Sequence, residues 1–160
     1  MTVDRDRPPN AGSERGEVTI RAVREDDLPI LFEHQRDPEA NAMAGFPPRD
    51  REAFMAHWRK ILSDPSLVAR AIELDGAVAG NIGSFEFEGR REVGYWIDRA
   101  VWGRGVATRA LAAFLQQETR RPLFAGVAAH NAGSMRVLEK CGFERTGETG
   151  ADGHVIFRLG

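Results

Sequence analysis

The sequence predicts a mixed α/β fold, of the α+β type, in which helices flank a mostly antiparallel central sheet. Asp75-Gly76 and Asp152-Gly153 each separate two strand-like runs, and such dipeptides favour the tight turns of antiparallel hairpins. Around Gly103-Arg104-Gly105, a β-rich run changes at once into a helical pattern, which indicates a strand, a tight turn and a helix in succession. The chain has 160 residues, 42% hydrophobic and 29% charged, which are the size and composition of one globular domain.

The first part of the chain is predicted to hold two helices and four strands. An amphipathic helix after Asp27 is expected to end at Asp37-Pro38, and a second helix, after Asp50, is expected to end at Asp64-Pro65. Residues 37–50, between the two helices, are predicted to form a variable loop that contributes to specificity, together with the terminal hairpin around residue 150. The strands are expected at Val18 to Ala22, Leu67 to Leu74, Ala77 to Phe87 and Glu92 to Asp98.

The second part is predicted to alternate helices and strands. The segment after Gly105 carries one apolar stripe at helical spacing, formed by Ala107, Ala110, Leu111, Phe114 and Leu115. A strand at 122–129 and a helix at 132–141 follow, with Gly142 as a left-handed cap. A closing antiparallel pair is expected around 143–148 and 154–159. This order implies a sheet whose two central strands separate and hold a cofactor between them.

The glycines at 103 and 105 predict a cradle for phosphate groups. Glycine tolerates positive φ and lets a ligand approach the backbone, while the free N–H groups and the dipole of the next helix attract an anion. A P-loop is excluded, because no Gly-Lys-Ser/Thr closes the loop. A dinucleotide-binding fingerprint requires a third glycine where Thr108 stands, and an acidic residue roughly twenty positions later. Because residues 124–127 contain no carboxylate, that alternative is weaker; an ordinary strand-to-helix turn stays open.

A second segment, Asn131 to Phe143, follows the apolar run 123–129 and contains the pattern Asn-x-x-Ser and the ending Lys-Cys-Gly-Phe. In this order and spacing, the two segments resemble the GNAT superfamily of acyl-CoA N-acyltransferases. The string Gly-Tyr-Trp-Ile, the loop Trp-Gly-Arg-Gly-Val-Ala-Thr and the Asn-x-x-Ser turn are most similar to the branch that acetylates protein N-termini, including those of ribosomal proteins. Trp102 and Ala107 depart from the residues usual in the family. The resemblance is strong over 92–143 and extends more weakly over 17–159.

The resemblance implies acetyl-CoA as the cosubstrate. Loop N–H groups are expected to bind its pyrophosphate, and the strand backbone at 95–97 is expected to bind the pantetheine amides. Arg104 is preferred to Arg109 as a phosphate contact. The residues expected to bind the cosubstrate are Trp96, Ile97, Gly103, Arg104, Gly105, Val106, Ala107, Thr108 and Asn131. No metal is assigned, because the four histidines and the single cysteine share no ligand spacing.

Ser134 and Glu92 are the catalytic candidates that the resemblance implies. Ser134 is expected near the thioester sulfur, where its hydroxyl can protonate the leaving thiolate, although a serine in the first turn of a helix is also ordinary. Glu92 matches a position at which some family members keep a glutamate that acts as a base through water; a strand-edge carboxylate is the alternative. Asn131 is expected to cap the helix that begins at Ala132, with its NH₂ group available to the cosubstrate. Cys141 is expected to be a buried structural residue, because no histidine is patterned with it.

The acceptor is predicted to be an amine, preferably the α-amine of a protein or peptide. An α-amine has a pKa of about 7.7 to 8.0 and is substantially neutral near neutral pH, whereas a lysine amine at about 10.4 is almost fully protonated. Small-molecule amines, a non-catalytic acyl-CoA-binding module and a nicotinamide enzyme stay as alternatives. Neither nucleic acid nor membrane is expected as a partner, since the net charge is −2 and no apolar run is long enough to span a bilayer.

The remaining expectations concern organisation and location. Residues 1–16 are predicted to be a disordered tail, and 17–160 a single N-acetyltransferase domain. One cysteine is consistent with a reducing cytoplasm. The oligomeric state is open, with a homodimer among the alternatives.

Overall fold

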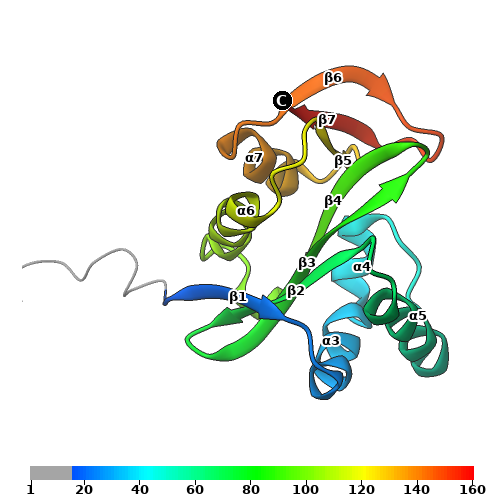
Figure 1. The fold of residues 1–160 in the computed structure, drawn as a ribbon, viewed down its shortest axis with the longest axis vertical. Helices are drawn as coiled ribbons and strands as arrows, with labels where there is room; N and C mark the ends of the chain where they lie inside the picture. The colour runs from blue at the N-terminus through cyan, green and yellow to red at the C-terminus, as the bar shows by residue number, and fades with distance from the viewer. Residues whose placement is uncertain (1–15) are drawn as a thin grey trace, which may run out of the picture.

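A computed structural model describes residues 16–160 and contains one seven-stranded sheet with the order β1-β2-β3-β4-β5-β7-β6 (Figure 1). All neighbouring strands are antiparallel except β4 and β5, which are parallel, so the predicted mixed and mostly antiparallel sheet is confirmed. Most of the predicted tail, 1–15, lies outside the described residues. Gly16 was assigned to that tail, but it is buried, and its carbonyl accepts a hydrogen bond from the guanidinium of Arg109.

The first four strands pair in sequence order and are all antiparallel, and the predicted hairpin at Asp75-Gly76 is confirmed. Hairpins join β2 to β3 and β3 to β4, and the turn residues Asp75 and Gly76 both have left-handed backbones, with φ of 53° and 83°. The left-handed conformation at both central positions matches the twist of the flanking strands. The strands are β1 (Val18–Ala22), β2 (Val68–Leu74), β3 (Ala77–Phe87) and β4 (Arg90–Ile97).

Helices α3 to α5 cover one face of these four strands (Figure 1). Their bounds are η1 (Glu25–Asp27), α3 (Leu28–Gln35), α4 (Pro38–Ala44) and α5 (Arg51–Ser63). The prediction of a loop over 37–50 is wrong for its first half, where α4 forms. Asp37 caps α4, because its side chain accepts a hydrogen bond from the N–H of Glu39 at 3.0 Å, and Pro38 occupies the first helical position.

The second part of the chain covers the other face with α6 and α7 and completes the sheet (Figure 1). Its elements are η2 (Arg99–Val101), α6 (Val106–Gln117), β5 (Leu123–Val127), α7 (Ala132–Lys140), β6 (Glu144–Thr149) and β7 (Val155–Leu159). The closing hairpin is confirmed, with β7 inserted between β5 and β6. Gly142 has φ of 95°, as expected for the residue that ends α7. Fully buried Leu111, Phe114, Leu138 and Phe157 belong to the core on this face.

A buried polar cluster anchors the end of α6 to the sheet. Glu118 Oε1 accepts a hydrogen bond from Ser84 Oγ on β3 at 2.5 Å and lies 3.5 Å from Arg91 Nε on β4. Arg120 adds a hydrogen bond from Nη2 at 2.8 Å. Burial alone would raise the pKa of Glu118, but the hydrogen bonds from Arg120 and Ser84 lower it to about 2. The charged carboxylate therefore helps to hold α6, and with it the glycine loop that begins this helix.

The sheet is divided at its centre. Among the described residues, β4 and β5 are paired only where Glu92 lies opposite Phe124. Beyond that pair the two strands diverge, while β4 stays paired with β3 as far as Ile97 and β5 stays paired with β7 as far as Val127. The predicted separation of two central strands is confirmed.

Candidate active site

A cavity of about 600 Å³ lies where β4 and β5 diverge. Its walls come from α4, the end of β4, the loop that leads into α6, the first turn of α6 and the length of α7. Eight of the nine predicted cosubstrate residues line it, namely Trp96, Ile97, Gly103, Gly105, Val106, Ala107, Thr108 and Asn131, and Ser134 lines it as well. Arg104 and Glu92, although predicted for the site, are not among its lining residues.

The glycine loop and the start of α6 form one end of the cavity. Gly103 and Gly105 have φ of 82° and 73°, and Gly105 is the residue that precedes the first turn of α6. No side chain caps this helix, so the N–H groups of its first turn face the cavity together with the positive end of the helix dipole. A side chain at Gly103 would meet no protein atom within 4 Å, which leaves room for a ligand beside the backbone. This end of the cavity is suited to an anionic group.

Arg109 braces the loop from the α6 side. Its guanidinium donates to the carbonyl oxygens of Gly105 at 3.3 Å and of Arg104 at 2.9 Å, in addition to Gly16. These bonds hold the loop carbonyls on the side of the loop away from the first-turn N–H groups. The cavity lining includes neither Arg104 nor Arg109. The preference for Arg104 as a phosphate contact stays a prediction.

Ser134 and Asn131 begin α7 on the opposite side of the cavity. The side-chain oxygen of Asn131 accepts a hydrogen bond from the N–H of Ser134 at 3.1 Å, so the predicted capping role of Asn131 is confirmed. The hydroxyl of Ser134 lies 2.6 Å from the hydroxyl of Tyr95 on β4. Burial raises the pKa of Tyr95 to about 12, so this phenol stays protonated and can donate to Ser134. Sequence reasoning assigned only a backbone role to Tyr95, because nothing local indicates a contact with a residue so distant in sequence.

Glu92 lies at the apex of the divergence, away from the cavity lining. Its side chain is buried, and it precedes Tyr95 by about 10 Å along the strand. Burial raises the pKa of Glu92; the nearby carboxylates of Glu88 and Asp152 add to this, and Arg90 opposes it. A carboxyl group with a raised pKa at this apex stays a candidate proton acceptor, which would have to act through water.

Hydrogen bonds attach α4 to the segments that follow the two diverging strands, β4 and β5. Arg99, which follows β4, donates to the carboxylate of Asp37 at 2.5 Å, and His130, which follows β5, lies 2.8 Å through Nε2 from the carbonyl oxygen of Ala42. Ala40, Met43 and Ala44 of α4 line the cavity. The predicted specificity region around Met43 is therefore a helical wall held at two points.

Cys141 shows the properties of a structural residue. It is half-buried at the end of α7, and its thiol lies 3.6 Å from the carbonyl oxygen of Thr108. Burial raises the pKa of Cys141, whereas a nucleophilic cysteine needs a lowered pKa.

Residues 16–160 show neither a metal-binding cluster nor a membrane-spanning helix. Within this part of the chain, no group of three or more histidine, cysteine, aspartate or glutamate residues is placed to hold a metal ion. None of the helices in the same range is both long and apolar enough to traverse a bilayer.

Comparison with known proteins assigns most of the chain to one family. Residues 17–144 match the family described as Acetyltransferase (GNAT) domain. The probable N-acetyltransferase YjcK of Bacillus subtilis (strain 168) is 43% identical over 60 residues, which cover 34% of this chain and 33% of that protein. The match thus spans about a third of this relative's length.

Several solved structures share the fold. An aminoglycoside acetyltransferase, AAC(6')-Ib in complex with coenzyme A, superposes with a TM-score of 0.75 at 21% identity, over 89% of this chain and 93% of that one. The spermidine N-acetyltransferase of Vibrio cholerae, in complex with CoA and spermine, has a TM-score of 0.75 at 16% identity over 89% and 93%. RimL, a ribosomal L7/L12 α-N-protein acetyltransferase, has a TM-score of 0.73 at 19% identity over 88% of each chain. At these identities the likeness concerns the fold, and it includes proteins named for small-molecule and for protein acceptors.

Proposed function

This chain belongs to the GNAT acetyltransferase family, and we propose that it transfers the acetyl group of acetyl-CoA directly to an amine, with a protein or peptide α-amine as the acceptor. The observation that carries the proposal is the cavity between the diverging strands, which ends at the uncapped first turn of α6. A diphosphate at one end and an extended pantetheine arm along a strand are the two features of acetyl-CoA that such a cavity fits.

The binding mode follows from the groups that the cavity presents. The first-turn N–H groups of α6, beside Gly103 and Gly105, would receive the pyrophosphate. The edge of β4 at Trp96 and Ile97 is not paired with β5. Its backbone groups would form hydrogen bonds with the pantetheine amides, as an added β-strand would. The acetyl end would then lie near Ser134 and Tyr95, on the wall formed by α7 and β4.

The chemistry proposed is direct transfer without an acyl-enzyme. The amine nitrogen attacks the thioester carbonyl carbon, a β4 N–H stabilises the tetrahedral oxyanion, and the carbon–sulfur bond then breaks with its electron pair on sulfur. Ser134 gives its proton to the thiolate, and Tyr95 supports Ser134 by donating to its oxygen. Glu92 is the proposed acceptor of the amine proton, through water.

The preference for an α-amine follows from acidity. A catalyst whose base acts at a distance is better matched to an amine that is already largely neutral near pH 7.5, which an α-amine is and a lysine amine is not. Small-molecule amines are the second candidate, because two of the structures that share the fold are named for aminoglycoside and spermidine acceptors.

The test is a coenzyme A release assay with acetyl-CoA and a panel of peptides with free N-termini, their N-terminally blocked counterparts, amino acids, polyamines and aminoglycosides. Release that needs a free N-terminus supports the proposal, and release only with polyamines or aminoglycosides replaces the acceptor class. Calorimetric binding of acetyl-CoA without turnover on any amine would show a non-catalytic binding module. Absence of acetyl-CoA binding would refute the function altogether.

A further inference from the structure

His154 and Asp152 form a pair in the turn between β6 and β7. The carboxylate of Asp152 accepts the backbone N–H of His154 through Oδ1 at 3.1 Å, and its Oδ2 lies 2.8 Å from His154 Nδ1. The turn itself is closed by backbone bonds between Gly150 and His154 at 2.8 Å and between Gly153 and Gly150 at 2.9 Å. A carboxylate beside Nδ1 favours the tautomer that carries its proton there, which leaves Nε2 with a lone pair able to accept a proton.

The strand register places His154 at the open end of the divergence. Glu92 and Phe124 mark the apex, and four residues beyond them along the two arms lie Trp96 and Ala128. Because β5 and β7 are antiparallel, with Val127 opposite Val155, His154 lies beside Ala128. His154 therefore lies on the β5 side of the divergence, four residues beyond the level of Phe124, and Glu92 at the apex is close enough to interact with it electrostatically.

The free nitrogen of His154 faces the segment that follows the α4 wall of the cavity. A side chain at Gly45 would come within 3.8 Å of His154 Nε2 and within 3.5 Å of Ala128 Cβ. Gly45 directly follows Ala44, which lines the cavity. His154 thus lies one residue beyond the cavity lining, and the missing side chain at Gly45 leaves space of about one methyl group beside its Nε2.

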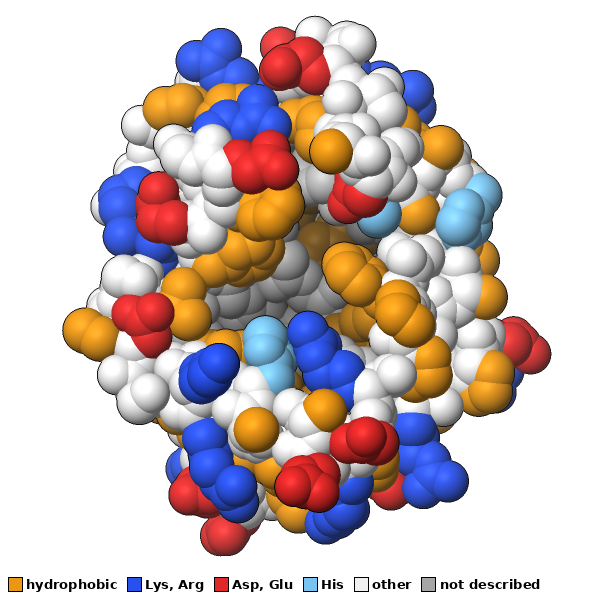
Figure 2. Space-filling model, turned by 90° about the vertical axis from the view of Figure 1, so that its right-hand side faces the viewer, with side chains coloured by type: hydrophobic (Ala, Val, Ile, Leu, Met, Phe, Trp, Pro, Cys, Tyr) orange, Lys and Arg blue, Asp and Glu red, His pale blue; other side chains and the backbone are white. Residues whose placement is uncertain are grey.

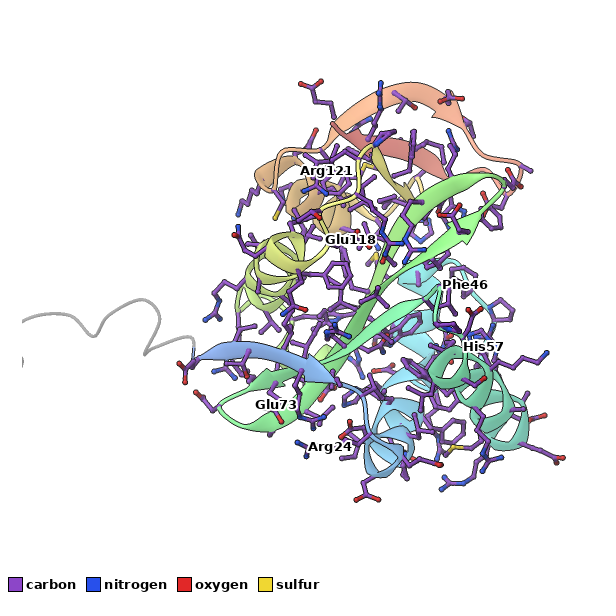
Figure 3. All side chains as sticks on the ribbon, in the orientation of Figure 1. Arg24, Phe46, His57, Glu73, Glu118 and Arg121 are labelled. Carbon is purple, nitrogen blue, oxygen red and sulfur yellow. The ribbon has the colours of Figure 1, made fainter. Side chains whose placement is uncertain are left out.

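An aromatic side chain lies beside His154. The rings of Phe46 and His154 lie 6.0 Å apart between their centres, and 14% of the His154 side chain is exposed. Phe46 lies on the right-hand side of the molecule in Figure 3. Figure 2 shows that this side is hollowed near its centre and that hydrophobic side chains gather around the hollow.

We propose that His154 is the general base of the acceptor side, that its Nε2 takes the proton of the attacking amine, and that Asp152 holds the ring in the required tautomer. The inference rests on the proposed function and replaces Glu92 as the group that first receives the proton. The carbon–nitrogen bond forms first, and the amine proton goes to His154. When the carbon–sulfur bond then breaks, the Ser134 proton goes to sulfur, and solvent carries the proton of His154 back to Ser134.

Two carboxylates bear on the position of His154. Asp152 lies in the same turn, and Glu92 on β4 interacts electrostatically with both residues. Burial alone would raise the pKa of Asp152, but the backbone N–H and the ring of His154 lower it, so Asp152 is ionised near neutral pH. His154 must be neutral to act, so the rate should fall in acid.

The experiment compares pH profiles of kcat/KM for the wild type, His154→Gln, Asp152→Asn and Glu92→Gln with one peptide acceptor. We expect His154→Gln to lose about 10² to 10⁴ in kcat/KM and to lose one inflection on the acidic limb. Asp152→Asn should lose less and keep an inflection, because the ring stays in place as a base without its anionic partner. Calorimetry should give unchanged acetyl-CoA affinity in all variants. His57→Gln is the matched control, a half-buried histidine on α5 whose loss should leave both rate and profile unchanged.

Two further measurements separate catalysis from structure. Imidazole added to His154→Ala should restore part of the rate, and the defect of His154→Gln should shrink with acceptor amines of lower pKa, which need less help from a base. The inference is overturned if His154→Gln keeps its rate and its acidic limb, or if only Glu92→Gln loses the inflection. Failure of the wild type to release coenzyme A with any amine is a different result, since it removes the proposed function itself.

Discussion

Replacing Tyr95 by phenylalanine isolates the hydroxyl contact between β4 and α7. The substitution keeps the ring in the cavity wall and removes only the oxygen that lies 2.6 Å from Ser134 Oγ. If Tyr95 donates to Ser134, its loss makes the Ser134 hydroxyl a poorer proton donor at the moment when negative charge develops on sulfur. The effect should therefore appear in the transition state rather than in the binding of acetyl-CoA.

The size of the effect follows from the contact. A hydrogen bond between neutral groups contributes about 0.5 to 1.5 kcal/mol net, and more where charge develops on the acceptor. About 1.4 kcal/mol corresponds to a factor of ten in rate. We expect Tyr95→Phe to lower kcat about tenfold and to leave the acetyl-CoA dissociation constant within about twofold of the wild type. Because the pKa of Tyr95 is about 12, no inflection from this group should appear in the wild-type profile below about pH 11.

The assay is a double-mutant cycle on kcat, measured by coenzyme A release, with acetyl-CoA affinity from calorimetry. Tyr95→Phe should cost little or nothing further in the Ser134→Ala background, because the Tyr95 hydroxyl acts only through the hydroxyl of Ser134. Full additivity of the two losses would contradict the argument, and so would an unchanged kcat in Tyr95→Phe alone. A loss of affinity with kcat intact would mean that the hydroxyl only shapes the cavity.

Three other predictions address the cradle, the serine and the anchor of α6. Gly105→Val should weaken acetyl-CoA binding by about tenfold or more, because its side chain obstructs the first-turn N–H groups; Gly89→Val strains a backbone of similar φ in open space and should bind normally by calorimetry. Ser134→Ala should lower kcat and leave acetyl-CoA affinity intact, and an unchanged kcat would reduce Ser134 to a first-turn residue. Glu118→Gln should lower the free energy of unfolding by about 1–3 kcal/mol at pH 7. The folded pKa of Glu118 is depressed to about 2, so its stabilisation is present above the ordinary carboxyl pKa and is lost as the pH falls from about 5 to 2. In urea unfolding, the stabilities of the wild type and Glu118→Gln should therefore converge in acid. An equal difference in stability at pH 7 and in acid would rule out the charge as the cause.

The parts of the fold that local pattern determines were predictable. The turn at Asp75-Gly76, the glycine loop before α6 and the cap at Asn131 each depend on residues close together in sequence. Helix α4 was missed because a seven-residue helix has no room for an amphipathic pattern, although Asp37 before Pro38 is a recognisable start signal.

The parts of the candidate site that depend on packing were not predictable. The hydroxyls of Tyr95 and Ser134 meet only because β4 and α7 lie on either side of the divergence. His154 follows an Asp-Gly turn, which indicates a hairpin and nothing about its ring. Glu92 was predicted as a base from the resemblance, and its place at the apex depends on the pairing of β4 with β5, which the sequence does not show.

The single pair at the apex also has a consequence for amide hydrogen exchange. In an antiparallel pair of strands, the backbone groups of alternate residues point to the same neighbouring strand. About half of the amides of β4 beyond Glu92 are therefore bonded to β3, and the others face the cavity between β4 and β5. Without acetyl-CoA, those second amides have only solvent to bond and should exchange quickly, although they belong to a central strand. When the pantetheine arm occupies the space, they should become as slowly exchanging as their neighbours, so occupancy of the cavity can be followed residue by residue along one strand.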